Sequence, residues 1–417
     1  MHILMHFSWL MSDSDPEWAV LQVFDALASL PFLNDLHLSC WPVSNPSLQP
    51  RRLPHLEILT LTRESWQDDD CITIIPIAKL ISWSQPKLTT LIINDYRYRD
   101  NQNPPNLNDF LSETSKSSVF LKITHLTLKG LFVKLNATVL PHLRSLISLT
   151  TQGVFSPQDQ DSGNRGAGFS SGNIWWVLRL EKIHLQEIVT DDVQLALIEY
   201  LASFSGLRRL RLTEAPSYGT LPQVSDELAI KFYERALQDH VHSLDSLEIN
   251  TNYEGNWSFA SHWSSIIKKC TRLTFLKLSI NSEDMAEEKH DKEDSSASGD
   301  NVVVGVLTSV QSYAKLPAQW SLLDICAALP ALKTLTLLSA SPERSRGLTY
   351  GTVAPKYCTR TNAKISRNVT SYKPITSSHA FRIVIDRNEY ELRRDELCMN
   401  LGYRPIRPIT KHFHRWG

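Results

Sequence analysis

The chain repeats a short pattern of apolar and variable positions. An apolar residue is followed by two variable residues, an apolar residue, one variable residue and a final apolar residue. The alternation at the end of this LxxLxL phrase has the period of a β-strand with one buried face. A single strand of this kind cannot bury that face alone, so we predict that the copies stack side by side in a parallel sheet with a leucine core. Ten copies are found, the fifth being the weakest, at residues 33–38, 56–61, 88–93, 123–128, 143–148, 180–185, 207–212, 244–249, 273–278 and 332–337.

Most copies follow a segment with helical spacing of apolar residues. Residues 20–30 have this spacing and stop at Pro31, and residues 320–329 repeat the design with Pro330 as the stop. Parallel strands need such crossover connections, and helices are their usual form. Further helices are predicted at residues 192–204 and 263–270, and from a capping Ser225 through residue 238, whereas the short spacing before Leu143 leaves room only for a turn.

Leucine also marks the limits of the repeat. Of 57 leucines in the 417 residues, 53 lie before residue 341. Two segments without periodicity, one rich in Gln, Asp, Ser and Gly and the other strongly acidic, interrupt the copies and predict loops. We therefore divide the chain into an N-terminal segment (1–16), a repeat domain (17–340) with loop inserts at 156–173 and 283–300, and a basic, loosely ordered C-terminal extension (341–417). In the extension we predict irregular structure to residue 378, a strand at 381–385 and a short helix at 389–401.

Charge argues against several classes of partner. The chain has 43 Lys and Arg against 44 Asp and Glu, a balance that does not favour a dedicated nucleic-acid binder. This balance averages a net charge of −6 in residues 283–300 and +9 in residues 343–417. The basic extension is compatible with binding an acidic partner, RNA or a membrane surface, but a loosely ordered segment partly balanced by the acidic insert is the simpler interpretation. We expect a protein partner, with no nucleic acid and no membrane.

The predicted cellular compartment depends on targeting signals that the sequence lacks. It has no apolar run of the length that crosses a bilayer, and its first residues lack the basic start and the cleavage site of a signal peptide. None of its six cysteines lies within four residues of another, so we expect single buried thiols in a reducing compartment. These features predict a cytoplasmic or nuclear protein.

Catalytic and metal-binding motifs are missing from the sequence. It contains no HExxH, GxSxG or GxxxxGK[ST] motif. The run at residues 68–70 consists of three aspartates without the spacing and glycine of a calcium loop, which indicates a solvated turn. The HxH pairs at residues 240–242 and 412–414 have no neighbouring ligands at metal-site spacing. We therefore predict a protein that is not an enzyme and that has no catalytic residues, cofactor or metal.

The remaining candidate for function is a surface. The variable positions of the phrase are expected on the concave face of the sheet, where a ladder of mixed polar side chains suits protein recognition. Three arginines in one copy stand out, because guanidinium groups make paired contacts with carboxylate or phosphate. A merely solvated sheet face is the alternative for any single position. The candidate binding residues are His37, Thr60, His125, His184, Arg208, Arg209, Arg211, Glu248, Phe275 and Lys277.

These phrases resemble those of leucine-rich repeat proteins, and in particular the F-box-type proteins of filamentous fungi. The likeness covers roughly residues 19–340, and residues 232–249, 253–259, 269–278 and 322–337 carry it most clearly. It implies an α/β leucine-rich-repeat solenoid, a horseshoe with a concave parallel sheet and a mostly helical convex side.

In that family an N-terminal F-box binds the adaptor of a cullin ubiquitin ligase, and the repeats hold the substrate. Here the helix and strand phrases begin by about Glu17, which leaves too little room for an F-box, either because the gene model is truncated or because the coupling is lost. The resemblance therefore implies non-catalytic protein recognition, with a role in ubiquitin-dependent degradation that requires an F-box upstream. The alternative is a structural or regulatory scaffold with no ligase link.

Overall fold

A computed structural model gives the fold of the chain. It describes residues 4–11, 15–39, 52–63, 74–84, 87–95, 105–116, 120–154, 172–215, 221–281, 318–342, 355–373, 380–394 and 401–406. The expected loops at 156–173 and 283–300 lie outside these ranges, except for residues 172 and 173, as do Asp68–Asp70 and the His412–His414 pair.

One sheet of 14 strands, arranged in the order of the sequence, runs through the described residues. The first twelve strands are parallel, and the last two are antiparallel to their neighbours. The prediction of an α/β fold with a mostly parallel sheet is thus confirmed. The strands are β1 (His6–Leu10), β2 (Asp35–Ser39), β3 (Ile58–Arg63), β4 (Thr90–Asp95), β5 (His125–Lys129), β6 (Ser148–Gln152), β7 (Glu187–Thr190), β8 (Arg209–Ala215), β9 (Ser246–Thr251), β10 (Phe275–Ile280), β11 (Thr334–Ser339), β12 (Arg382–Ile385), β13 (Asn388–Arg394) and β14 (Leu401–Pro405).

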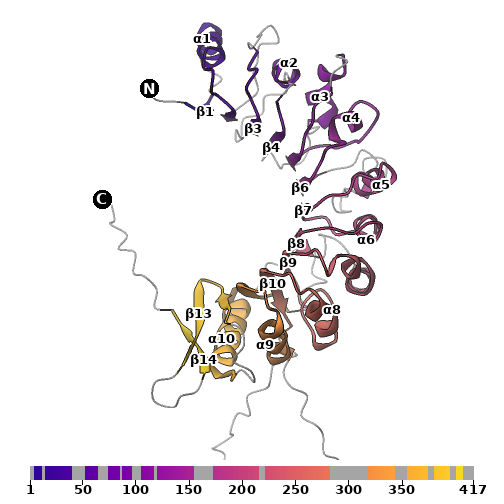
Figure 1. Ribbon diagram of the computed structural model, residues 1–417, viewed down its shortest axis with the longest axis vertical. Helices are drawn as coiled ribbons and strands as arrows, with labels where there is room; N and C mark the ends of the chain where they lie inside the picture. Colours follow the sequence, from indigo (N-terminus) through magenta and orange to yellow (C-terminus); the bar gives the residue numbers. More distant parts are fainter. Residues whose placement is uncertain are drawn as a thin grey trace, which may run out of the picture.

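Helices connect the strands on the outer side of the molecule. Figure 1 shows the strands along the inner side of an arc and the helices around its outer side. None of the helices within the described ranges combines the length and the apolar character needed to cross a bilayer. The helical elements are α1 (Glu17–Ala28), α2 (Ile75–Trp83), α3 (Leu107–Leu111), η1 (Thr114–Lys116), α4 (Leu140–Leu143), α5 (Gly172–Leu180), α6 (Leu195–Leu201), α7 (Pro222–Lys231), η3 (Phe232–Ala236), η4 (Leu237–His240), η5 (Ser261–Trp263), α8 (Ser264–Lys269), α9 (Ala318–Ala328) and α10 (Pro355–Ser371).

The core lies between the sheet and the helices, and the leucines of the phrase form its inner layer. In one unit, Leu207 enters from the turn before β8, and Leu210 and Leu212 follow from the strand, all of them buried. Eight of the ten predicted copies have this register. Alternation sends the intervening side chains to the face that the helices leave uncovered, which is the inner face of the arc.

A shared carbonyl joins each unit to the next just before the strands begin. The backbone oxygen of Gln186 accepts hydrogen bonds from the N–H groups of Arg208 and Arg209, at 2.8 and 3.0 Å. The oxygen of Arg208 in turn accepts from Asp245 and Ser246, at 2.8 and 3.1 Å. The oxygens that accept two such bonds belong to Met5, Asn34, Glu57, Thr89, Thr124, Ile147, Gln186, Arg208, Asp245 and Thr274. This ladder fixes the lateral register of the sheet.

Two predicted copies were placed in the wrong register. Residues 143–148 span the end of α4 and the first residue of β6, and residues 180–185 span the end of α5 and the turn before β7. The third inward position of these units is threonine, Thr151 in β6 and Thr190 in β7, so neither unit completes an LxxLxL phrase. His184 therefore lies before β7 rather than on the sheet.

The C-terminal extension is more regular than its sequence predicts. Irregular structure up to residue 378 is wrong for α10, in which the buried residues Thr361, Ile365 and Val369 have helical spacing although most of the other residues of the helix are polar. The strand predicted at 381–385 is confirmed as β12.

The helix predicted at 389–401 is wrong, because this part of the chain contains β13 and the start of β14. Tyr390 in β13 lies opposite Ile383 of β12 and Pro405 of β14, and pairing on both sides outweighs the local helical preference.

Two smaller differences concern the N-terminal segment and the α7 region. Residues of the N-terminal segment form β1, which the sequence did not reveal because Phe7 and Trp9 stand opposite Leu36 and Leu38 in place of leucines. Helix α7 begins at Pro222, so Ser225 is not its cap; instead its hydroxyl accepts a hydrogen bond from the Trp257 indole N–H at 3.2 Å. The helices predicted at 20–30, 192–204, 263–270 and 320–329 are confirmed by α1, α6, α8 and α9 within a few residues.

Candidate protein-binding face

Most of the predicted binding residues lie in strands, where they form cross-strand rows on the inner face of the sheet. Arg211 of β8 lies opposite Glu248 of β9, which lies opposite Lys277 of β10. In the neighbouring row, Arg209 stands between Glu187 of β7 and Ser246 of β9. Directly opposed side chains on one face lie about 4.5–5.5 Å apart at Cβ, close enough for opposite charges to pair.

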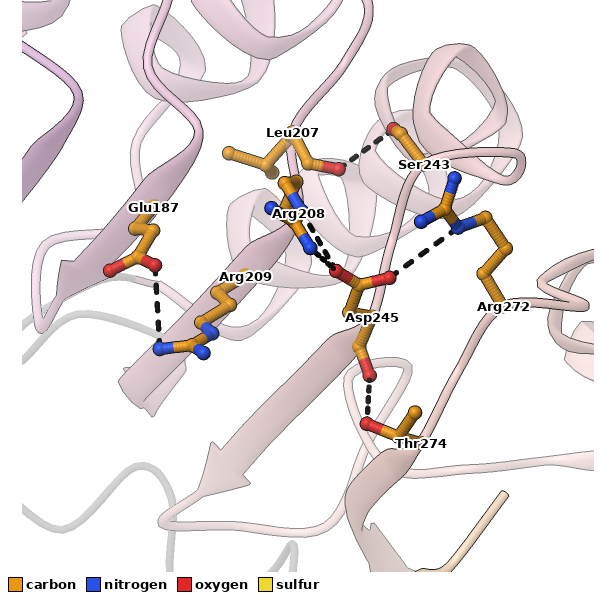
Figure 2. A network of polar contacts seen from close by, with 8 residues as sticks. All are labelled: Glu187, Leu207, Arg208, Arg209, Ser243, Asp245, Arg272 and Thr274. Carbon is orange, nitrogen blue, oxygen red and sulfur yellow. Dashed lines mark hydrogen bonds and ion pairs between the residues drawn. The ribbon is translucent and has the colours of Figure 1, made fainter. Parts of the chain in front are cut away.

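Asp245 is the centre of one part of this charged face (Figure 2). Its Oδ2 accepts the Arg208 Nε–H at 2.8 Å and also lies 2.7 Å from Arg208 Nη2. Its Oδ1 lies 3.5 Å from Nε of Arg272, which comes from the turn before β10. Its backbone oxygen accepts the Thr274 hydroxyl at 3.0 Å. One carboxylate therefore holds two arginines from different units.

Glu248 and Glu187 hold the other cations of the face. Glu248 Oε2 lies 3.4 Å from Arg211 Nε and 3.7 Å from Lys277 Nζ, so this carboxylate also lies between two cations. Glu187 Oε1 lies 3.3 Å from Arg209 Nη1. We call the eight residues the arginine face: the cations Arg208, Arg209, Arg211, Arg272 and Lys277, and the acids Glu187, Asp245 and Glu248.

The acids of the arginine face are recessed and its arginines project. The side chains of Arg208, Arg209, Arg211 and Arg272 are 54%, 66%, 48% and 59% exposed, against 32%, 20% and 18% for Glu187, Asp245 and Glu248. The outermost layer is thus positively charged, although most of its charges are paired below. Such exposed ion pairs contribute about 0–1 kcal/mol each, so they hold the arginines loosely.

Hydroxyl groups surround a predicted histidine at the N-terminal part of the sheet. His37 on β2 lies within hydrogen-bond distance of three hydroxyl groups, those of Ser8 at 3.3 Å and of Ser39 and Thr62 at 3.1 Å. The neighbouring position on β3 is Thr60, which the register places opposite His37.

Two further predicted residues of the inner face belong neither to the arginine face nor to the hydroxyl groups around His37. His125 begins β5, where its Nδ1 lies 2.9 Å from the hydroxyl of Thr124. Phe275 begins β10 beside the arginine face, opposite Ser246.

Two other histidines belong to the interior or the turns. His184, placed on the concave face by its sequence, stacks on Phe204 with ring centroids 5.1 Å apart, outside any strand. His240, the first member of an HxH pair, is buried; its Nε2 lies 3.0 Å from the Leu201 carbonyl, and its Nδ1 accepts the Leu207 N–H at 3.4 Å. With Nδ1 accepting, Nε2 carries the proton and the ring is neutral.

Desolvation shifts the pKa of two buried thiols and of two carboxyls that are only partly shielded from solvent. Burial raises the pKa of the Cys270 thiol to about 12, and it raises the pKa of Cys326 as well, so neither forms a thiolate near neutral pH. At the carboxyl ends of β7 and β8, burial raises the pKa of Asp191 and of Glu214, and the charge of Asp191 raises that of Glu214 further. Across the ranges that the structure describes, no three His, Cys, Asp or Glu residues are grouped as metal ligands.

Reasoning from the sequence alone missed two members of the arginine face. Glu187 was overlooked because the register of its unit was misplaced, and Arg272 because it precedes the phrase of its unit. A signal for Glu187 exists in hindsight: shifting the unit to begin at Leu185 places Ile188 and Thr190 inward and Glu187 outward. Asp245 was among the outward positions but was not singled out as a centre of charge.

Comparison with known proteins gives no further assignment. No protein-family model matches the chain, and no curated protein matches its sequence.

Proposed function

We propose that the chain is a leucine-rich-repeat horseshoe whose inner face binds another protein without catalysis. The observation that supports this is the exposed set of polar and charged side chains on a sheet whose register is fixed by shared carbonyls. A preorganised surface of this kind loses little conformational entropy on binding. The cross-strand rows offer regularly spaced contacts to a partner that lies along the arc.

The test places a photo-crosslinking residue on either face of the full-length chain. Benzoylphenylalanine replaces Thr127, which lies on the inner face of β5, or Lys268, which is exposed on α8 at the outer side. We expect a product of defined mass from position 127 only, and we expect it to disappear when Thr150, which lies opposite Thr127 on β6, is changed to arginine. Cross-linking from position 268 but not from 127 would place the binding surface elsewhere.

The resemblance to F-box proteins extends this proposal to substrate recognition for a cullin ubiquitin ligase. Its test is purification of the protein expressed from the full-length native transcript. Recovery of the ligase adaptor in stoichiometric amount supports the ligase role. Recovery of a partner without the adaptor supports the alternative, a structural or regulatory scaffold with no ligase link.

A further inference from the structure

We propose that the arginine face binds an extended segment of the partner that carries Asp or Glu at alternate positions. This inference rests on the proposed function, since it names the part of the partner that the inner face would recognise. It assigns the charged part of that face, β7 to β10, as the site of contact.

The charges of this face do not balance. Five cations stand against three carboxylates, and the more exposed members of the set are the arginines. A negatively charged segment approaching from the open side of the arc therefore meets guanidinium groups before it meets the recessed acids. Charge complementarity favours an acidic partner and disfavours a basic one.

Two of the internal acids are shared between cations, so a cation can leave its internal acid for a carboxylate of the bound segment at a small cost in free energy. Asp245 lies between Arg208 and Arg272, and Glu248 lies between Arg211 and Lys277. A carboxylate from outside can take one cation of each set and leave the internal acid with the other. In these two sets no charge is then left unpaired. The usual cost of breaking an ion pair, a charge without a partner, is therefore avoided.

The guanidinium groups also have unused hydrogen-bond donors. Arg208 donates to Asp245, whereas Arg209, Arg211 and Arg272 make ion pairs at 3.3–3.5 Å and donate no hydrogen bond to any described residue. A guanidinium group has five N–H donors in a planar fork that fits a carboxylate. These donors face the inner side of the arc, where a bound segment can accept from them.

Spacing favours several carboxylates over one compact anion. Arg209 and Arg211 lie on the same face of β8, two residues and thus about 6.6 Å apart along the strand. Alternate side chains of an extended segment have the same spacing, so a segment parallel to β8 can present one carboxylate to each arginine. The three arginines of the β8 unit, Arg208, Arg209 and Arg211, engage three different acids rather than converging on one point, which is unlike a site built for a single phosphate.

The test uses fluorescein-labelled peptides and fluorescence anisotropy at low ionic strength with the full-length protein. The probe is a peptide of alternating Thr and Glu. Its comparison peptides are alternating Thr and Gln, a peptide with the same number of Glu at every third position, and the Thr–Gln peptide with one phosphothreonine. The double variant Arg209→Gln/Arg211→Gln is matched by Lys268→Gln/Lys269→Gln, which removes the same charge from exposed residues of α8 on the outer side. Thermal melts check that both variants fold.

We expect the wild-type protein to bind the alternating Thr–Glu peptide more tightly than the three comparison peptides. The arginine variant should bind it about tenfold more weakly, and the lysine variant within about twofold of the wild type. Equal losses in both variants, equal binding of the two Glu peptides, or tighter binding of the phosphopeptide would overturn the inference. Absence of peptide binding, combined with cross-linking from position 127, overturns the acidic segment but leaves inner-face recognition standing.

Discussion

The hydroxyl of Thr151 donates a hydrogen bond of 3.0 Å to Oγ1 of Thr190 inside the sheet, at positions where neighbouring units bury leucine or isoleucine. Thr190 Oγ1 also accepts the N–H of Asp192 at 3.1 Å. The two polar side chains are fully buried and satisfy one another across β6 and β7.

This arrangement predicts an order of stabilities for valine variants, which keep the shape of threonine. Thr190→Val removes the acceptor of both the Thr151 hydroxyl and the Asp192 N–H, and it should lower the free energy of unfolding by about 1–3 kcal/mol. Thr151→Val leaves Thr190 bonded to Asp192, so its effect should be smaller. Urea denaturation followed by circular dichroism measures both. A larger loss for Thr151→Val would contradict the assignment of Thr151 as donor and Thr190 as acceptor.

Neighbouring positions of β8 should respond very differently to alanine. Leu210 is buried in the leucine core, so Leu210→Ala should lower the free energy of unfolding by about 2–5 kcal/mol. Arg209 projects from the opposite face and makes one exposed ion pair, so Arg209→Ala should cost about 0–1 kcal/mol. Urea midpoints of the two variants provide the measurement. Similar losses for the two would mean that the strand faces are assigned wrongly.

A buried ion pair links the ends of β3 and β4. Arg63 donates to both carboxylate oxygens of Asp95, from Nε at 2.9 Å and from Nη2 at 2.5 Å, and both side chains are at most 3% exposed. Asp95→Ala leaves a buried guanidinium without this partner and should cost about 3–5 kcal/mol.

The matched control for Asp95 is an ion pair on the surface. Glu199→Ala removes the acid from the Arg179–Glu199 pair, whose atoms lie 2.9 Å apart with both side chains nearly half exposed. It should cost about 0–1 kcal/mol. Thermal melts of the two variants in the same buffer give the loss in melting temperature for each. An equal loss would show that the buried Arg63–Asp95 pair matters no more to stability than the exposed pair.

Two buried histidines should make the fold sensitive to acid. Burial lowers the pKa of His142 and of His240. Each ring accepts a backbone N–H at Nδ1, from Leu121 at 3.0 Å and from Leu207 at 3.4 Å, which requires the neutral form. The unfolded chain takes up these protons near pH 6.5, before the folded chain does. The contribution to stability is therefore complete above about pH 6.5 and is lost as the pH falls below it.

The measurement is the free energy of unfolding in urea at a series of pH values from about 7.5 to 5.5. The double variant His142→Asn/His240→Asn should be less stable at the upper end, and its stability should fall less steeply with decreasing pH. His242→Asn, which changes an exposed histidine two residues after His240, is the control. A slope in the double variant as steep as that of the wild type would refute the assignment to these two residues.

The leucine positions made much of the sheet predictable from the sequence. Where all three inward residues are aliphatic, as in the unit of Leu207, Leu210 and Leu212, the phrase placed the strand and its outward arginines correctly. The phrase failed where Thr151 and Thr190 replace an aliphatic residue, because a hydrogen bond across two strands has no period in the sequence.

The charged face was predictable only in part, for a similar reason. Alternation places Arg209 and Arg211 outward, but it does not say which acids lie beside them. That depends on the lateral register between units, which brings Glu187 and Glu248 next to these arginines. Arg272 reaches Asp245 from a turn, outside the strand pattern altogether.

Because shared carbonyls join neighbouring units, the position of a strand in the sheet does not depend on the number of residues in its unit. Just before each of the strands β2 to β11, one carbonyl oxygen of the preceding unit accepts from two N–H groups, although the connections on the outer side differ in length. Segments between strands can therefore lengthen or shorten during evolution without displacing the residues of the inner face. In protein engineering, the outer connections should accept inserted tags or domains while Arg209, Arg211 and Glu248 keep their mutual positions.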